Sequence, residues 1–374
     1  MDITKTFLLL LRASVDNTVP TIGNLSPRDW KLLFDISKQQ AVAGLVYNAV
    51  EKLPKPQQPP FKLAVELCSL KEKIALRNKL LDQCCAEVYS FFKDHGFDST
   101  ILKGQGLARL YIADDGTPLG HLRHSGDVDI WPSGGRKQIY NFIRHHEPLS
   151  GLNYHHVHFE TFGEVPVEVH VTPSDFNNPL RNARLQSLFS RLQDEQCHNP
   201  LPIAGTQISV PTREFNLFYI LLHIFHHYLN EGVGLRQLID YYFVLKDAKG
   251  DPTQILLLQE RLKEFHMFRF ARGIMWILHE IFGLDEQYLI AEPDENRGRR
   301  LLREILTGGN FGQFDPRINR KMKQTPWGRM LSTIGTLSRR FSEQPAEILW
   351  NIPFRFSVWF WRSFLVRKSM IADK

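Results

Sequence analysis

The hydrophobic positions in the first part of the chain recur at helical spacing. Residues 27–53 contain two such segments, preceded by Ser26, which is typical of a helix N-cap, and starting at Pro27, which suits the first helical position. After the proline-rich break PKPQQPP, apolar residues three or four positions apart predict one long helix over residues 61–93. We therefore expect an N-terminal helical region over residues 1–95.

Beyond residue 95 the pattern changes to short runs in which apolar and polar residues alternate. The expected elements are strands at 99–102 and 127–131, helices at 105–112 and 136–145, and a hairpin formed by HHVHFETF and VPVEVHV around Gly163 and Glu164. Strands and helices mixed within so short a stretch predict a small α+β core with a mixed sheet over residues 96–200.

Helical spacing returns after a short predicted hairpin, PIAGTQISV, and continues to the end of the chain. The runs FNLFYILLHIFHHYL and GLRQLIDYYFVLK predict strong helices. We therefore expect a C-terminal helical region over residues 201–374. The predicted fold class is α+β, with a small mixed-sheet core flanked in sequence by two helical regions.

The end of the chain is strongly basic. Residues 317–374 hold twelve Lys and Arg residues against three acidic residues, in a chain whose net charge is +6. A stripe of apolar residues occupies positions 349, 352, 356, 359, 360 and 364. We expect this terminal helix to pack on the body of the protein. The alternative is an interfacial helix that makes a peripheral contact with an anionic surface, such as lipid or an acidic polymer.

The longest apolar runs, FLLLLRASV and VWFW, are shorter than the ~20 residues that a membrane span requires, so no transmembrane segment is expected. The N-terminus MDITKTF lacks the features of a secretory signal. The cysteines have neither disulfide-framework nor zinc-type spacing, so we expect buried thiols at Cys68, Cys84, Cys85 and Cys197. These features favour a cytoplasmic location.

Two acidic residues stand two positions apart in the predicted strand of SGDVDIWP. On a strand, Asp127 and Asp129 point to the same face. Two close carboxylates repel each other and lose solvation, so such a pair is usually retained where it binds a cation. Because an Asp-x-Asp sequence also arises by chance in a chain of this length, the neighbouring residues decide its meaning.

The neighbouring residues favour bound phosphate and metal. Ser125 and Gly126 allow backbone N–H groups to approach an anion directly before the pair. Lys103 and Gly104 precede a predicted helix N-terminus, where phosphate oxygens are favoured. The later strand VPVEVHV adds a third carboxylate, Glu168. Three carboxylates suit a pair of Mg²⁺ ions, the arrangement used in phosphoryl and nucleotidyl transfer.

At this level of detail the sequence resembles a known family. LKGQGLARLY, LRHSGDVDIW and VEVHV resemble the motifs of a bacterial uncharacterised nucleotidyltransferase family within the DNA polymerase β-type nucleotidyltransferase superfamily. DWKLLFDISKQQAVAGLVYNAV and LLHIFHHYLNEGVGLRQLIDYYFVL look like its flanking helices, so the resemblance covers most of the chain to about residue 250. The first turn is Lys-Gly-Gln-Gly, where the broader superfamily has Gly-Ser or Gly-Gly.

The resemblance implies a Mg²⁺- or Mn²⁺-dependent enzyme that transfers a nucleoside monophosphate from an NTP such as ATP to an acceptor hydroxyl and releases pyrophosphate. Asp127 and Asp129 would hold the metals, and Glu168 would complete the catalytic metal site and help to deprotonate the acceptor. The residues implied on the nucleotide side are Lys103, Gly104, Arg123, Ser125, Gly126 and His170.

Two alternatives remain open from the residues alone. The first is a catalytically degenerate member that binds nucleotide or a partner. The second is an Asp-x-Asp glycosyltransferase, which needs an alternating β/α unit upstream of the motif, where this sequence predicts helices. The acceptor is unknown, and a small molecule, a saccharide, a protein or RNA would each suit the motifs.

Eight of the 15 histidines fall between residues 121 and 170. His156 and His158, two positions apart on a predicted strand, would suit zinc, but no downstream pattern supplies a matching ligand set. We therefore expect His170 to face the active cleft beside Glu168. Asp240, in an apolar helix, is expected to be structural and to accept hydrogen bonds from Arg236 or from the N-terminus of a neighbouring helix.

Overall fold

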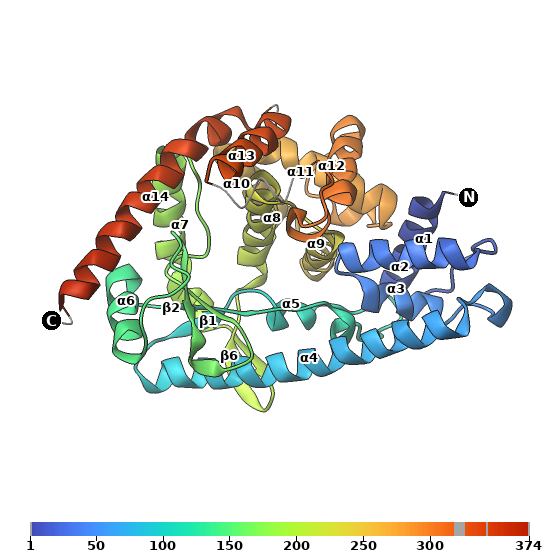
Figure 1. Cartoon of the computed structure of the whole chain (residues 1–374), viewed down its shortest axis with the longest axis horizontal. Coiled ribbons are helices and arrows are strands. Elements are labelled where there is room, and N and C mark those ends of the chain that lie inside the picture. The colour runs from blue at the N-terminus through green and yellow to red at the C-terminus, as the bar shows by residue number, and fades with distance from the viewer. Residues whose placement is uncertain (1, 318–325, 342, 373–374) are drawn as a thin grey trace. The chain divides into compact units, whose positions relative to one another are not determined.

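The computed structural model describes residues 2–317, 326–341 and 343–372 (Figure 1). The described chain is rich in helix and contains a four-stranded mixed sheet and a two-stranded sheet, in agreement with the expected α+β class. It divides into two compact units. The first contains described residues of Met1–Leu80, Leu107–Ser125 and Asn216–Gly328, and the second contains those of Leu81–Gly106, Gly126–Phe215 and Arg329–Lys374. The division into three consecutive sequence regions stays a prediction.

The N-terminal part of the chain is helical, as predicted. Its helices are α1 (Ile3–Val15), α2 (Pro27–Gln39), α3 (Ala43–Val50) and the long α4 (Phe61–Asp94) (Figure 1). The predicted cap of α2 is confirmed: the Ser26 hydroxyl accepts a hydrogen bond from the Asp29 N–H at 3.2 Å. In return, the Asp29 carboxylate accepts one from the Ser26 N–H at 3.2 Å, which completes a capping box.

The mixed sheet lies in the second unit and has the strand order β1-β2-β4-β3. The strands are β1 (Ser99–Ile101), β2 (Val128–Pro132), β3 (His156–Phe159) and β4 (Val167–His170). β2 and β4 are parallel, whereas β1 pairs with β2 and β3 pairs with β4 in the antiparallel sense. The predicted hairpin around Gly163 is therefore confirmed, and the strand predicted at 127–131 begins one residue later.

One face of this sheet is apolar and closes a hydrophobic core. Ile130, Val157 and Val169 point into it and are fully buried. They belong to one cluster with Val88 of α4 and with Ile139 of α6 (Gly135–His146). Because side chains alternate along each strand, the polar residues between these positions share the opposite face. Core packing on one face therefore dictates which side chains can form a site on the other.

The remaining elements of the middle of the chain are short, except for one helix. They are α5 (Gln105–Ala108), α7 (Pro179–Cys197), and the predicted hairpin of β5 (Pro200–Ile203) and β6 (Thr206–Ser209). The helix predicted at 105–112 is shorter than expected, since α5 ends at Ala108. Tyr111 is fully buried in the first unit, where its hydroxyl donates to Asp240 at 2.6 Å.

The C-terminal part is helical, as predicted. Its helices are α8 (Arg213–Asn230), α9 (Leu235–Asp247), α10 (Pro252–Glu264), α11 (Phe268–Trp276), α12 (Glu295–Gly308), α13 (Pro326–Arg340) and α14 (Pro345–Ala372). Short 3-10 or π turns are η1 (Lys55–Gln57), η2 (Gly120–Leu122), η3 (Glu160–Phe162), η4 (Ile277–Ile281), η5 (Glu286–Tyr288) and η6 (Asn310–Gly312).

The terminal helix α14 packs on the rest of the second unit, where Trp361 contacts the core and Phe354 contacts Tyr154, but its apolar stripe does not make the contact as expected. Five of its residues are between 53% and 67% exposed: Leu349, Ile352, Phe356, Trp359 and Phe360. Position 364 lies outside the side chains that the structure describes. The buried face carries Glu347 and Asn351 instead, because the Glu347 carboxylate accepts hydrogen bonds from Arg181 and from the backbone of residues 177 and 178. A contact of the basic tail with an anionic surface stays a prediction.

None of the described helices combines the length and the apolar composition that crossing a bilayer requires. The expectation of buried thiols holds for Cys84, Cys85 and Cys197, but it is wrong for Cys68, which is exposed on α4. All four cysteines are free, in line with their spacing.

A buried ion pair holds part of the first unit together. Arg123 and Asp240 are 3% and 5% exposed, and two parallel hydrogen bonds of 2.7 and 2.9 Å join their side chains. The expected donor to Asp240 was Arg236 or the N-terminus of a neighbouring helix, and this expectation is corrected: Arg123 and Tyr111 supply the hydrogen bonds. Burial raises the pKa of the Asp240 carboxyl, but the Arg123 charge and hydrogen bonds outweigh it and hold this pKa below its usual range.

We predict that Arg123→Met lowers the free energy of unfolding by about 3–5 kcal/mol, because it leaves the Asp240 carboxylate buried without its counter-charge. The loss should be present above pH 3.8 and should diminish as the pH falls and Asp240 becomes protonated. Urea unfolding at several pH values measures it. The matched control, Arg299→Met, breaks an ion pair whose side chains are 63% and 61% exposed, and it should cost less than about 1 kcal/mol. Equal losses in the two variants would contradict this account.

Candidate active site

The parallel pairing of β2 with β4 places two acidic residues side by side. Asp129 of β2 is the direct register partner of Glu168 of β4, with Val128 opposite Val167 and Ile130 opposite Val169. Neighbouring residues in register point to the same face of a sheet. Because the valine and isoleucine side chains fill the core, both carboxylates point to the polar face.

Asp129 is buried, and two cationic or hydrogen-bonding groups compensate its charge. Lys103 Nζ lies 3.0 Å from Asp129 Oδ1, and His170 Nε2 lies 2.8 Å from the same oxygen. The Leu102 N–H donates to the Asp129 carbonyl at 2.9 Å. This hydrogen bond holds the end of β1 against β2 and so places Lys103 beside the Asp129 carboxylate. Burial raises the pKa of Asp129, but the Lys103 charge and the His170 hydrogen bond outweigh it and hold this pKa well below its usual range.

Glu168 is the more accessible of the two acids, with a side chain that is 23% exposed. Its Oε2 lies 3.6 Å from His170 Nε2. Burial raises the pKa of Glu168, yet hydrogen bonding by His170 outweighs it and lowers this pKa to about 2. Burial alone lowers the pKa of His170, but the two carboxylates reverse this and raise it above 6.5. Asp129, Glu168 and His170 thus form one coupled group of charges.

Strand β3 brings two more histidines to the same face. His156 pairs in register with His170, and His158 pairs with Glu168. His156 Nδ1 lies 3.3 Å from Glu168 Oε2, and His158 Nε2 lies 4.0 Å from Glu168 Oε1. Burial and the neighbouring His155 lower the pKa of His156 to about 3, so its ring is neutral at neutral pH.

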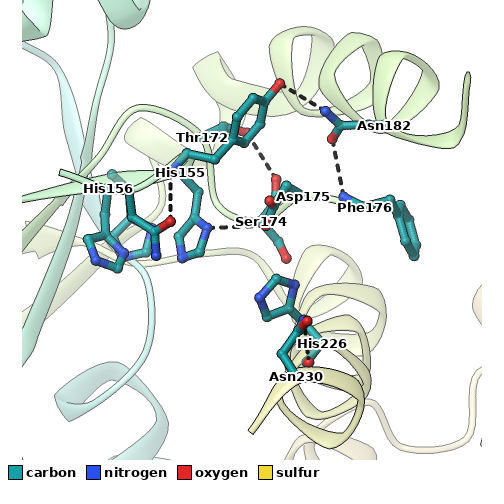
Figure 2. A network of polar contacts seen from close by, with 12 residues as sticks. His155, His156, Thr172, Ser174, Asp175, Phe176, Asn182, His226 and Asn230 are labelled. Atoms are coloured by element: carbon teal, nitrogen blue, oxygen red, sulfur yellow. Dashed lines mark hydrogen bonds and ion pairs between the residues drawn. The ribbon is translucent and has the colours of Figure 1, made fainter. Parts of the chain in front are cut away.

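The segment after β4 is held by its own polar network. Figure 2 shows the His155 ring directed toward Asp175, with His155 Nδ1 3.1 Å from Asp175 Oδ1. The Asn182 side chain accepts a hydrogen bond from the Phe176 N–H at 3.2 Å and donates to the Tyr154 hydroxyl at 2.8 Å (Figure 2). These contacts tie the start of β3 to the chain that follows β4, and so fix the histidines at this end of the sheet.

The other predicted site residues are divided between the two units. Asp127 directly precedes β2 and is half-buried. Gly104 has a φ of +52°, and a Cβ placed there would stand 3.6 Å from the Asp127 carbonyl oxygen, so the Lys103 turn lies against the backbone of Asp127. Gly126 is exposed. The Ser125 hydroxyl accepts a hydrogen bond from Arg123 at 2.6 Å within the first unit.

The structure thus brings Lys103, Asp129, Glu168 and His170 together in the second unit. Among the described residues, three-residue sets have metal-ligand atoms within 4.8 Å of one another, and Asp127 belongs to none of these sets. Phosphate contacts by Gly104, Ser125 and Gly126 stay predictions. The same holds for Arg123, whose guanidinium is already bound by Asp240.

The donor atoms suit a divalent cation. The ligand atoms of Asp129, Glu168 and His170 all lie within 4.8 Å of one another. Carboxylate oxygens are the ligands that Mg²⁺ and Mn²⁺ prefer, and a contribution by the Asp127 carboxylate stays a prediction. The approach of His156 and His158 to Glu168 was not expected from the sequence, although the two histidines stand two positions apart on a predicted strand.

Comparison with known proteins places the chain in a family. The model of a family described as uncharacterised nucleotidyltransferase matches residues 26–283, which is more than half of the chain. No curated protein and no solved structure matches the chain. The matched range contains both paired strands and the Lys103 turn, with Asp129 and Glu168. The chain therefore belongs to the uncharacterised nucleotidyltransferase family.

Proposed function

We propose that the protein is a metal-dependent nucleotidyltransferase that moves a nucleoside monophosphate from an NTP to an acceptor hydroxyl and releases pyrophosphate. The observation that carries this proposal is the pairing of Asp129 with Glu168 in register on adjacent parallel strands, beside Lys103. Two acids on the face opposite the apolar core have no packing role there. Their charge is compensated by groups that a cation can replace, which is the property expected of a metal site.

Asp127, Asp129 and Glu168 would hold Mg²⁺ or Mn²⁺ in this proposal. The residues fit such an ion because Asp129 and Glu168 are both ionised, as their lowered pKa values indicate. When bound, the divalent cations neutralise the triphosphate and stabilise the charge that develops on the transferred phosphoryl group. The role of the protein chain is to position the ligands, because the β2–β4 register fixes the distance between Asp129 and Glu168.

The transfer forms a bond from the acceptor oxygen to the α-phosphorus and breaks the bond from that phosphorus to the pyrophosphate oxygen. The acceptor loses a proton in this step. We assign Glu168 to holding the cation, and its help in deprotonating the acceptor hydroxyl stays a prediction. The proton is finally released to solvent.

Lys103 has a second role in the proposal. Its ammonium group pairs with Asp129 and is 15% exposed, so it can turn toward an incoming phosphate. The positive φ of Gly104 directs the chain around this turn beside Asp127, close to the acids. In the proposal, Asp129 would hold the cation and Lys103 would pair with the triphosphate.

We predict that Asp129→Asn and Glu168→Gln each lower nucleotidyl transfer by at least about 10³-fold, because each removes a carboxylate that would hold the cation. The assay incubates the full chain with each labelled NTP, Mg²⁺ or Mn²⁺ and a cell extract, and follows the label into the acceptor. The matched control is Asp194→Asn on α7, an acid of the same unit whose side chain is 94% exposed, and it should retain full activity.

The double variant Asp127→Asn, Asp129→Asn provides the decisive comparison. Labelling at the wild-type level by this variant would show that the assigned chemistry is wrong. If the wild-type chain binds NTP and transfers nothing to any acceptor in the extract, the protein is a degenerate member of its family that acts by binding.

We further predict that, without metal, His170 titrates above pH 6.5 and that Asp129→Asn lowers its pKa, because burial then has less opposing charge. The stabilisation from this raised pKa is fully present below pH 6.5 and is lost as the pH rises through the folded-state pKa. NMR of the histidine ring protons across a pH series measures the pKa in both proteins. An unchanged pKa of His170 in the variant would contradict the proposed coupling.

A further inference from the structure

We infer that His156, His158 and Glu168 form a second metal site, which binds one divalent transition-metal ion of the Zn²⁺ type. This site goes beyond the proposed nucleotidyl transfer and does not depend on it. The two sites share one residue, Glu168, whose Oε2 lies near both His156 and His170 and whose Oε1 lies near His158. The ligand atoms of the three residues lie within 4.8 Å of one another.

The hairpin of β3 and β4 creates this cluster by its register. His158 stands directly opposite Glu168, and His156 is two positions along β3, so all three side chains share the polar face. The two imidazole rings lie nearly parallel, at 13°, with their centroids 5.7 Å apart. The register of the hairpin alone therefore brings His156 and His158 of β3 close to Glu168 of β4.

The distances fit a small ion. Ligand atoms around tetrahedral Zn²⁺, each about 2.0–2.1 Å from the metal, are about 3.3 Å apart. His156 Nδ1 and Glu168 Oε2 are separated by 3.3 Å, which already meets this requirement. The His158 Nε2 atom is 4.0 Å from Glu168 Oε1, and the His158 side chain is 49% exposed, so a small rotation of its ring brings this nitrogen closer to the carboxylate.

The donor types select for a transition metal over Mg²⁺. Two imidazole nitrogens with one carboxylate suit Zn²⁺ and its neighbours in the first transition row, whereas Mg²⁺ prefers oxygen ligands. His156 Nδ1 is buried and makes no hydrogen bond, so this ligand atom does not have to give up a partner when it binds a metal. Three protein ligands leave one position of a tetrahedral site for water or substrate.

Gly151 is a positioning residue for this site. A Cβ at residue 151 would stand 2.2 Å from the His158 ring, and the φ of Gly151 is +53°, in the region that favours glycine. The Ser150 carbonyl accepts a hydrogen bond from the His158 N–H at 3.1 Å, which holds this segment over the strand. Glycine at 151 therefore allows the ring to lie where it can approach Glu168.

Zinc binding by the full chain, freed of metal by a chelator and carrying no histidine tag, tests the inference. Competition with a chromophoric chelator, in the presence of excess Mg²⁺, gives the stoichiometry and the affinity. We predict one Zn²⁺ per chain, and at least a tenfold weaker affinity for His156→Ala and for His158→Ala. The matched control, His145→Ala with His146→Ala, removes two exposed histidines of the same unit and should leave the affinity unchanged.

Three further variants test this site, and one of them, Asp129→Asn, separates it from the proposed nucleotide site. Asp129→Asn should retain zinc, because Asp129 belongs only to the set with His170, whereas Glu168→Gln should weaken it. Gly151→Ala should also weaken zinc binding at least tenfold, although it keeps every ligand. Because no nucleotide is present, the outcome is independent of nucleotidyl transfer.

The inference is overturned if the wild type binds no zinc or if His158→Ala binds it as tightly as the wild type. It is also overturned if Asp129→Asn loses zinc while the His156 and His158 variants keep it, since the ion would then occupy the set with His170. Circular dichroism checks that each variant is folded. Should His156→Ala not fold, the half-exposed His158 decides the question through its own variant.

Discussion

The parallel pairing of β2 with β4 is the constraint on which the rest of the site depends. It sets Asp129 beside Glu168, while Ile130 and Val169 in the same register pack into the core on the other face. A slip of one residue would turn the carboxylates into the core and the apolar side chains into the site. The free energy of core burial therefore also fixes the geometry of the acids.

The same pairing creates an electrostatic cost that the surroundings offset. Two acids on one face, one of them fully buried, would favour protonation if left alone. The ammonium of Lys103 and the ring of His170 hold Asp129 ionised, and His170 extends this effect to Glu168. The chain thus maintains two carboxylates in the form that binds cations. In the proposed function, divalent cations would offset the charge of the two carboxylates, and Lys103 would pair with the triphosphate.

Local patterns in the sequence predicted much of this fold, and long-range pairings account for most of what they missed. The Ser26 cap, the length of α4 and the hairpin at Gly163 follow from nearest neighbours along the chain. The partner of Asp240 did not, because Arg123 lies more than a hundred residues away in sequence. The exposed stripe of α14 was misread for a related reason, since spacing shows that a helix has an apolar face but not what covers it.

The site shows the same division. The motifs pointed to Lys103, Asp129 and Glu168. The spacing of apolar residues, however, does not predict which strands are neighbours, so the parallel pairing of β2 with β4 was not expected. By contrast, the approach of His158 to Glu168 was within reach of sequence reasoning. The two residues are equally distant from Gly163, so a hairpin centred there pairs them directly, as it pairs His156 with His170.

The most direct test of the central claim is a double-mutant cycle on Mn²⁺ affinity with Asp129→Asn and Glu168→Gln. If the strand register makes the two carboxylates share one cation, each single variant loses most of the affinity and the double variant loses little more. Losses that simply add would show that the two acids bind independently, and this result would contradict the account.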